Sequence, residues 1–273
     1  MSHFKSSSAA QSLNSLEIRD WAVSILGANT LEDKLFTPEK LTDHHPGSPM
    51  IWNEPTRPID LAFQKVKRKS KLPPFHALHQ ADNRVECLHR FAGHELLAVE
   101  IMAYALLKFP DAPKHFRKGL ANTLKEEQEH VRLYIAQLER LGASFGDLPL
   151  YRHFWCHTPY LNSPLEYVSV MSLTFEMANL DFAPMYGSSF EKHGDLDAAN
   201  LMVRILKDEI AHVSFGWQWL QKFKCKEISD WDAWKKAQSP LLTPKRARGF
   251  VIYEEHRKRA GVSSEWIENL KSL

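Results

Sequence analysis

Residues 124–131 of this 273-residue chain read LKEEQEHV, and residues 206–213 read LKDEIAHV. The two octads share the pattern LK(E/D)ExxHV, so each places a histidine three residues after a glutamate. Positions i and i+3 lie about 60° apart on one face of an α-helix, and their side chains can reach the same point. The octads therefore predict two helices that each direct a glutamate and a histidine to one side.

The sequence around the octads repeats as well. Glu95 lies 32 residues before Glu127, and Glu176 lies 33 residues before Glu209. The chain is therefore interpreted as two copies of a helical hairpin, each with an acid on its first helix and an ExxH motif on its second. A lone ExxH motif is expected about once by chance in a chain of this composition, whereas a matched pair with this spacing is not.

All four glutamates fall on the apolar stripes of their helices; Glu95, for example, is in line with Phe91, Val99 and Met102. A carboxylate in such a position is costly unless it is paired or bound to a metal. Two histidines cannot neutralise four carboxylates, whereas two divalent cations balance their four charges. The sequence therefore predicts a two-metal centre in the helical core. Its expected ligands are Glu95, Glu127, His130, Glu176, Glu209 and His212.

Four further acids near the motifs are expected to support these ligands. Glu126 and Asp208 directly precede the motif glutamates, where each can accept the second ring N–H of a ligand histidine and fix its tautomer. A solvated surface acid is the alternative for Glu126. Glu100 and Asp181 follow the first-helix glutamates by five residues, about 140° around the helix. We expect them to act behind the ligands or in ion pairs rather than to bind metal.

A third ExxH motif, Glu86 with His89, is interpreted as an accident of composition. It has no repeat partner, and Glu86 lies nine residues before Glu95, on about the opposite side of the same helix. The remaining histidines have no matched partner either, so no ligand role is assigned to them.

The motifs lie on long stretches that carry apolar residues at helical spacing. Helices are expected at residues 81–108 and 114–141, from residue 163 onward, and at 195–223. Ser163 and Glu166 form a capping box, whereas Pro184 and Gly187 are expected to kink or end the third helix. Two helices, a long aromatic connection at 143–163 and two more helices are the connectivity of a bundle with one crossover. Strand signals are negligible, so the predicted fold is an all-α four-helix bundle.

Three regions are expected along the chain. Residues 1–75 are interpreted as an N-terminal extension with one short helix at 12–27 and proline-rich loops. Residues 76–224 contain the bundle, and residues 225–273 contain short helices, around 231–237 and 264–270, that pack on it.

Composition narrows the class of protein. The net charge is only +2, so the basic runs at 65–71 and 245–248 are interpreted as solvated faces, and nucleic acid is the less favoured partner. Three scattered cysteines without a CxxC pair indicate a reducing compartment. No apolar run is long enough to cross a membrane, and the start lacks the apolar stretch of a signal peptide. We therefore expect a cytoplasmic protein without a membrane partner.

The ligand pattern resembles that of the ferritin-like di-iron carboxylate proteins, in which two helices each supply a Glu and two others each supply Glu-x-x-His. The resemblance covers residues 81–223. Within that superfamily the chain is similar to a bacterial family described as a domain of unknown function, akin in fold to the MiaE-type tRNA hydroxylases. The likeness rests on Phe91, Glu95, Leu96, Ala98, Glu100, Glu127, His130, Gly146, Asp147, Leu148, Pro149, Glu176, Leu180, Asp181, Asp208, Glu209, His212, Val213 and Gly216.

The resemblance implies that Glu127 and Glu209 bridge the two metals. Glu95 with His130 would then complete the coordination of one metal, and Glu176 with His212 that of the other. Two iron ions are the expected cofactors, with manganese as the other candidate. One departure from the pattern is that the first octad reads Glu-Glu where the second reads Asp-Glu.

The expected function is that of an oxygen-activating oxidoreductase, a hydroxylase or oxidase, with molecular oxygen as co-substrate and an external electron donor. The substrate would be a small molecule or a group carried on RNA, and a homodimer is compatible with the sequence. One alternative is a ferroxidase or other iron-handling protein, although long flanks suit a covered pocket better than a compact storage subunit. The other is a non-catalytic, metal-stabilised module that binds RNA or protein.

Overall fold

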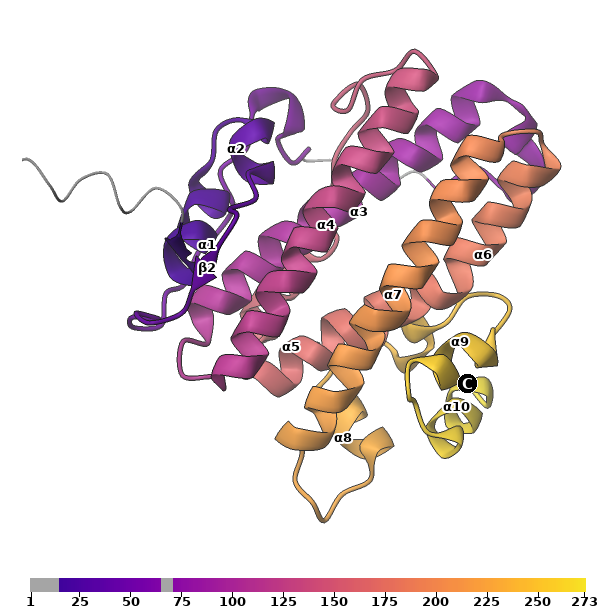
Figure 1. Cartoon of the computed structure of the whole chain (residues 1–273). Helices are drawn as coiled ribbons and strands as arrows, with labels where there is room; N and C mark the ends of the chain where they lie inside the picture. Colours follow the sequence, from indigo (N-terminus) through magenta and orange to yellow (C-terminus); the bar gives the residue numbers. More distant parts are fainter. Residues whose placement is uncertain (1–14, 65–70) are drawn as a thin grey trace, which may run out of the picture.

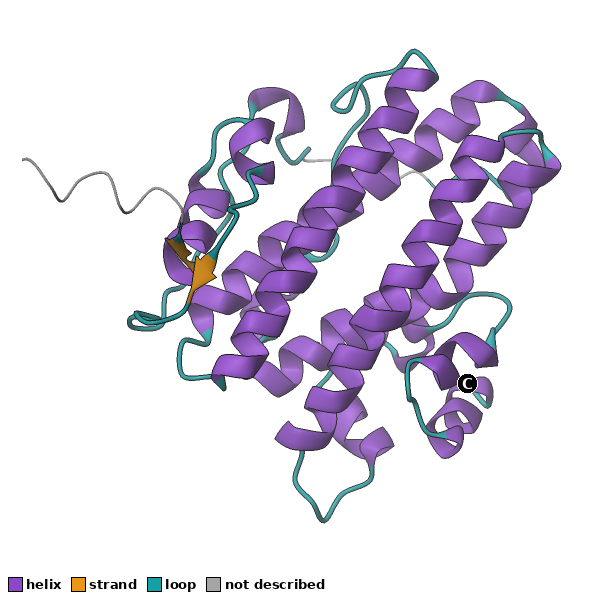
Figure 2. Cartoon of the chain, viewed as in Figure 1, coloured by secondary structure: helices purple, strands orange, loops and turns teal. Residues whose placement is uncertain are grey.

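The computed structural model describes residues 15–64 and 71–273 (Figure 1). Most of the predicted basic run at 65–71 and the first residues of the helix expected at 12–27 lie outside the described residues. Figure 2 shows that the described chain is almost entirely helical. Its strands are β1 (Leu16–Glu17) and β2 (Leu41–Thr42), which pair in parallel. The predicted all-α class is confirmed.

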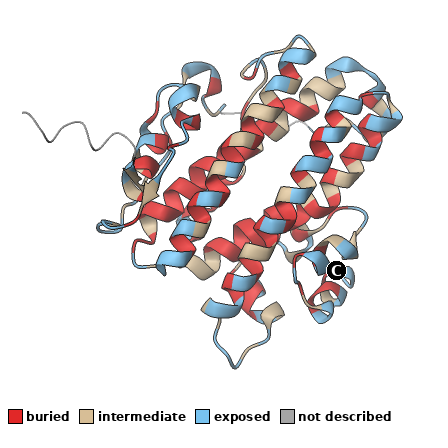
Figure 3. Ribbon diagram, in the orientation of Figure 1, coloured by how far each residue is buried: buried red, intermediate tan, exposed pale blue. Residues whose placement is uncertain are grey.

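Two helical hairpins form the four-helix core. In the first, α3 packs along α4, and in the second, α6 packs along α7, while α4 and α7 bring the hairpins together (Figure 1). Buried residues lie on the faces that the helices turn toward one another (Figure 3). The core elements are α3 (Ala81–Lys108), α4 (Lys114–Arg140), α5 (Pro164–Val170), η4 (Met171–Glu176), α6 (Met177–Lys192) and α7 (Leu196–Phe223).

Local sequence signals account for several helix ends. Helix α4 ends where Gly142 adopts a positive φ of 76°, and the Ala143 N–H bonds back to the Leu138 carbonyl, as in a Schellman motif. Ser163 and Glu166 form the predicted capping box of α5, and the Asp195 side chain caps α7. The connection between the hairpins carries η3 (Trp155–Tyr160), so the crossover is partly ordered by its own short helix.

The third helix differs from the expectation in two ways. Its middle, η4, is a π-helix that ends at Glu176, a wider winding that is frequent at functional sites. Moreover, the helix does not end at Pro184 or Gly187 but continues to Lys192. Pro184 has no N–H to donate to the Leu180 carbonyl four residues earlier. The His256 ring satisfies that carbonyl instead, with Nδ1 2.9 Å away.

The N-terminal segment covers α3. It contains α1 (Ile18–Gly27), α2 (Leu31–Leu35), η1 (Ile59–Leu61) and η2 (Phe75–His79), with α1 packed on α3. The expected helix therefore begins at Ile18, because the two residues before it pair with β2. Glu100, fully buried on α3, anchors this segment: it lies 3.1 Å from Lys34 Nζ and 2.6 Å from an Arg57 guanidinium nitrogen.

The C-terminal segment lies beside α6 and α7 (Figure 1). It contains α8 (Asp230–Lys236), η5 (Pro244–Ala247), α9 (Glu254–Arg259) and α10 (Ser264–Lys271). Two of these short helices match the expected ones, whereas η5 and α9 were not anticipated. The segment builds a second, smaller core in which Trp217 of α7 meets Trp234 and Trp266. Within the described ranges, no helix combines the length and apolar character needed to cross a membrane.

Asp181 anchors the C-terminal segment as Glu100 anchors the N-terminal one. Its buried carboxylate accepts hydrogen bonds from the backbone N–H groups of Gly249 and Tyr253, both at 2.8 Å. The Arg257 guanidinium donates two more, at 2.6 and 2.8 Å. Glu100 and Asp181 occupy equivalent places in the two hairpins. Each hairpin therefore uses the same position to hold one of the two flanking segments.

Replacing Asp181 by Asn should therefore destabilise the protein strongly. The change leaves the buried Arg257 charge without its counter-ion, a loss of about 3–5 kcal/mol. Urea unfolding followed by circular dichroism measures it. Glu255→Gln is the matched control, because Glu255 pairs with Lys258 on the exposed surface, and its unfolding midpoint should hardly move. An Asp181→Asn variant as stable as its control would contradict the anchoring role.

Candidate metal centre

The core of the bundle brings the predicted ligands into two adjoining groups. Glu95, Glu127 and His130 form one group, and Glu127, Glu176 and His212 form the other. Within each group, one donor atom per residue lies within 4.8 Å of the others, and all the residues are buried. Glu127 belongs to both groups. The geometry is thus that of two neighbouring three-ligand sites with one carboxylate in common.

Helix geometry explains why these side chains meet. Glu95 projects from α3, Glu127 and His130 from α4, and His212 from α7. Glu176 is the last residue of the π-helical turn in η4. Helix α7 comes very close to that turn at Gly216, where an added Cβ would lie 2.2 Å from Ser172 Cβ. A glycine at this position therefore allows α7 to approach the element that carries Glu176.

Each histidine is held from the opposite hairpin. His130 of α4 turns Nδ1 toward Glu127 Oε2 at 3.2 Å, and its Nε2 lies 3.3 Å from Asp208 of α7. His212 of α7 turns Nδ1 toward Glu127 Oε1 at 3.2 Å, and its Nε2 lies 2.8 Å from Glu126 of α4. The predicted partners of the histidines are thus Glu126 and Asp208, and each supports the histidine of the other octad. Glu126 is not merely a solvated acid.

Glu209 is placed differently from its repeat counterpart Glu127. It lines the same cavity, but it is not a member of either close group. Its Oε1 accepts a hydrogen bond of 2.8 Å from the Asn179 side chain, and its Oε2 lies 3.7 Å from His212 Nδ1. A symmetric pair of bridging glutamates is therefore not what the structure shows: Glu127 lies between the groups, and Glu209 lies to one side. Asn179 gave no signal in the sequence.

The donor set suits metal ions. Among the described residues, both Glu176 oxygens, Glu209 Oε2 and His212 Nδ1 are buried and lack a well-oriented hydrogen-bond partner. Unpartnered buried polar atoms are rare in folded proteins, and four that converge on one place call for a ligand. Oxygen and imidazole donors of this kind fit divalent iron or manganese. The residues present therefore fit a two-metal centre.

The pKa shifts show how the same residues compensate their charges by holding protons. Burial, together with the neighbouring Glu127 and Glu209, raises the pKa of Glu95 well above its usual value. Burial raises the pKa of Glu176 to about 8. Burial alone would lower the pKa of His130, but its hydrogen bonds to Asp208 and Glu127 outweigh it and raise the pKa to about 9. Protons thus replace positive charge where cations would otherwise sit.

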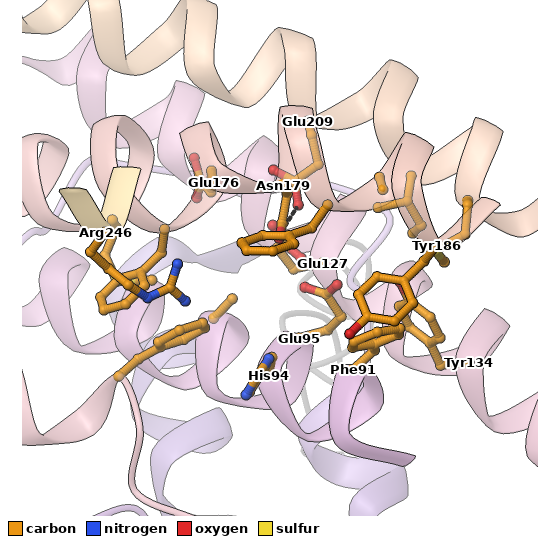
Figure 4. Close-up of a pocket in the computed structure, with 18 residues that line it drawn as sticks. Phe91, His94, Glu95, Glu127, Tyr134, Glu176, Asn179, Tyr186, Glu209 and Arg246 are labelled. Atoms are coloured by element: carbon orange, nitrogen blue, oxygen red, sulfur yellow. Dashed lines mark hydrogen bonds between the residues drawn. The ribbon is translucent and has the colours of Figure 1, made fainter. Parts of the chain in front are cut away.

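A cavity of about 50 Å³ opens beside the carboxylates. This volume has room for only a few water-sized molecules. Figure 4 shows Glu95 and Glu127 facing it, with Phe91, Tyr134 and Tyr186 on one side and Arg246 on the other. Phe154 of the crossover packs against Phe175, with ring centroids 4.5 Å apart and the rings tilted by 40°, and it lines the cavity. Aromatic side chains thus form part of the wall, and Phe154 among them comes from the crossover.

Other residues singled out in the sequence lie elsewhere. Glu100 and Asp181 form the ion pairs that anchor the flanks, so they do not act behind the ligands. Glu86 pairs with Arg90 at 3.1 Å, and His89 Nε2 accepts the N–H groups of Gly146 and Leu148. Burial lowers the pKa of His89 to about 4, which keeps it a neutral acceptor. The third ExxH motif thus holds the crossover rather than joining the metal groups.

Comparison with known proteins gives a family but no activity. Residues 22–268 match the model of a family described as "Protein of unknown function (DUF455)". An uncharacterized protein of Haemophilus influenzae is 25% identical over 173 residues, which are 60% of this chain and 58% of that protein. The match thus spans less than two thirds of the relative's length. No solved structure matches the chain.

The metal-free protein should lose stability as the pH rises from 6 to 9. Glu176 and His130 have ordinary pKa values of 4.5 and 6.5 and folded values of about 8 and about 9. Both groups bind a proton more tightly in the folded protein. Their contribution to the free energy of unfolding is therefore complete at a pH below their pKa in the unfolded chain, and it is lost as the pH rises through their pKa in the folded protein. Melting temperatures of chelator-treated protein across this range test it.

Glu176→Gln is the control for this titration. Glutamine keeps the shape of the side chain but cannot lose a proton, so the decline should be shallower in the variant. Metal removal should also cost more stability at neutral than at acidic pH, where the carboxylates are protonated. A melting temperature that stays constant or rises from pH 6 to 9 in the metal-free wild type would contradict this account.

Proposed function

The chain belongs to the family described as "Protein of unknown function (DUF455)", and we propose that it is a di-iron carboxylate protein of the ferritin-like type that oxidises an organic substrate. Manganese remains the alternative metal at one or both positions. Molecular oxygen would be the co-substrate, and an external donor would supply electrons.

The position of Glu127 carries the proposal. Its two oxygens face two different histidines, Oε2 toward His130 and Oε1 toward His212, each at 3.2 Å from a ring Nδ1. A carboxylate that bridges two metals needs one oxygen on each metal. Glu95 with His130 would then hold one of the two metals, and Glu176 with His212 would hold the other. The ring nitrogens on the far side are held by Asp208 and Glu126, which leaves both Nδ1 atoms available to metal.

When bound, two ferrous ions supply the capacity to react with oxygen and to cycle between oxidation states. The chain's own residues determine where that happens. The glutamates and histidines fix the ions on helices rather than on loops, which keeps their spacing rigid. The aromatic wall around Phe154, Phe175 and Tyr186 keeps bulk water away from the carboxylates. The adjoining cavity admits oxygen and the reacting end of a substrate.

The cavity favours oxidation of a substrate over iron storage. Its acidic lining consists of Glu95, Glu127, Glu176 and Glu209, which are the predicted ligands themselves. Among the described residues, its wall offers no further carboxylate that would pass iron onward. The rest of the lining is mostly apolar, and its basic side chains among the described residues are Arg246 and His94. Such a wall suits an organic molecule better than a stream of metal ions.

Anaerobic loading with ferrous iron tests the metal centre first. Wild-type protein should hold about two irons per chain, measured by elemental analysis after gel filtration. His130→Ala and His212→Ala should each lower that content. His89→Gln is the matched control, because His89 belongs to the third ExxH motif but accepts backbone hydrogen bonds, and glutamine keeps an acceptor. Loss of iron in the His89 variant alone would mean that the wrong motifs were chosen.

Mixing the loaded protein with oxygen then tests the chemistry. The wild type should consume oxygen at once, with an absorbance change that is absent in Glu127→Ala, where the shared ligand is lost. Iron that is retained but never reacts with oxygen, with or without candidate substrates, would refute the oxidoreductase and favour a non-catalytic metal module. Release of ferric iron after each turnover would favour a ferroxidase.

A further inference from the structure

Among the described residues, the wall of the cavity beside the carboxylates holds one guanidinium, that of Arg246, as well as the His94 ring. Arg246 projects from η5 in the C-terminal segment and lies over the face of Phe175, with its guanidinium carbon 5.0 Å from the ring centroid. Figure 4 shows the guanidinium at one side of the cavity, opposite Tyr134 and Tyr186. The side chain is half-buried, so its charged end lines a pocket and is still reached from outside.

Three arginines with buried side chains each have an anion, and Arg246 differs from them in having none in the ranges that the structure describes. Arg57 pairs with Glu100, Arg117 pairs with Asp43, and Arg257 pairs with Asp181. Within the described part of the chain, Arg246 donates no hydrogen bond and forms no ion pair. A guanidinium carries five N–H donors in a fixed fork, and the described residues offer those of Arg246 no acceptor. The contact with the Phe175 ring places the group but satisfies none of these donors.

The chain holds Arg246 in place through its neighbours. Three residues further on, Gly249 donates its N–H to the buried Asp181, and an added Cβ there would lie 2.8 Å from Asp181 Cβ. Ala247 packs in the second core, and its carbonyl accepts from Arg257. The backbone on the C-terminal side of Arg246 is thus fixed against α6. Arg246 is thus held in position by its neighbours and has no anion among the described residues, so it is available to bind an anionic ligand.

We infer that Arg246 binds the carboxylate of an organic substrate and orients that substrate toward the metal centre. A guanidinium fork matches a carboxylate with two parallel hydrogen bonds. Arg246 supplies one positive charge, which one carboxylate neutralises, whereas a doubly charged phosphate would leave a negative charge against a mostly apolar wall. The cavity is small, so only the part of the molecule next to its reacting end would enter it, beside the aromatic side chains of the lining.

The orientation of the substrate toward the metals rests on the proposed function. The binding of a carboxylate by Arg246 can be tested without it. The probes are phenylacetate and phenylacetamide, which share shape and differ in charge. Isothermal titration calorimetry compares their affinities for the manganese-loaded and the metal-free protein. We expect the wild type to bind the carboxylate about tenfold more tightly than the amide.

Variants assign that preference to Arg246. Arg246→Gln should bind both probes with about equal affinity, whereas Arg246→Lys should retain part of the preference because the charge remains. Arg248→Gln is the matched control, because Arg248 lies two residues away and donates to the carbonyls of Leu270 and Lys271 rather than lining the cavity. It should keep the full preference.

Three outcomes would overturn the inference. The wild type could bind both probes equally, or Arg246→Gln could keep the preference, in which case the metals alone attract the anion. Arg246→Gln could also change only the metal content, which would make Arg246 a counter-charge for the glutamates. Metal content is measured separately on every sample. A chain that binds no metal yet shows the Arg246-dependent preference would refute the proposed function and leave this inference standing.

Discussion

Four carboxylates meet in the core of one helical bundle, and the structure around them depends on how their charge is compensated. Glu95, Glu127, Glu176 and Glu209 are buried together with His130 and His212, and two imidazoles cannot balance four carboxylates. Without metal, protons make up the difference, as the raised pKa values of Glu95, Glu176 and His130 show. Two divalent cations would displace those protons and satisfy the buried atoms that lack partners. Under the proposed function, the same charge that makes the core costly without ligands would favour the binding of metal.

The flanks are attached by a second use of buried charge. Glu100 binds Lys34 and Arg57 of the N-terminal segment, and Asp181 binds Arg257 of the C-terminal one. Each acid follows the first-helix glutamate of its hairpin by five residues, on a different face of the helix. One face of each helix therefore serves the centre while another holds the covering segment. Through Asp181 the two functions meet, since the segment that it fixes also carries Arg246 into the wall of the cavity.

The sequence was informative where a periodic pattern decides the structure. The bounds of α3 and the two octads followed from helical spacing, and the glutamates and histidines of the octads do meet in the core. It contained no indication where the local structure depends on residues that are distant in the chain. The π-helical turn that ends at Glu176 has no sequence signal. Helix α6 continues past Pro184, and the Leu180 carbonyl that Pro184 leaves free is satisfied by the ring of His256, which is distant in the sequence. Asn179 and Arg246 belong to no motif, and the asymmetry between Glu127 and Glu209 is hidden by their matching octads.

The most direct test of the two-metal centre is anomalous diffraction at the iron absorption edge from crystals grown with ferrous iron. The account predicts two peaks per chain, about 4 Å apart, one beside His130 and Glu95 and the other beside His212 and Glu176, with Glu127 between them. A single peak, or iron bound away from these residues in a chain whose bundle is intact, would contradict it.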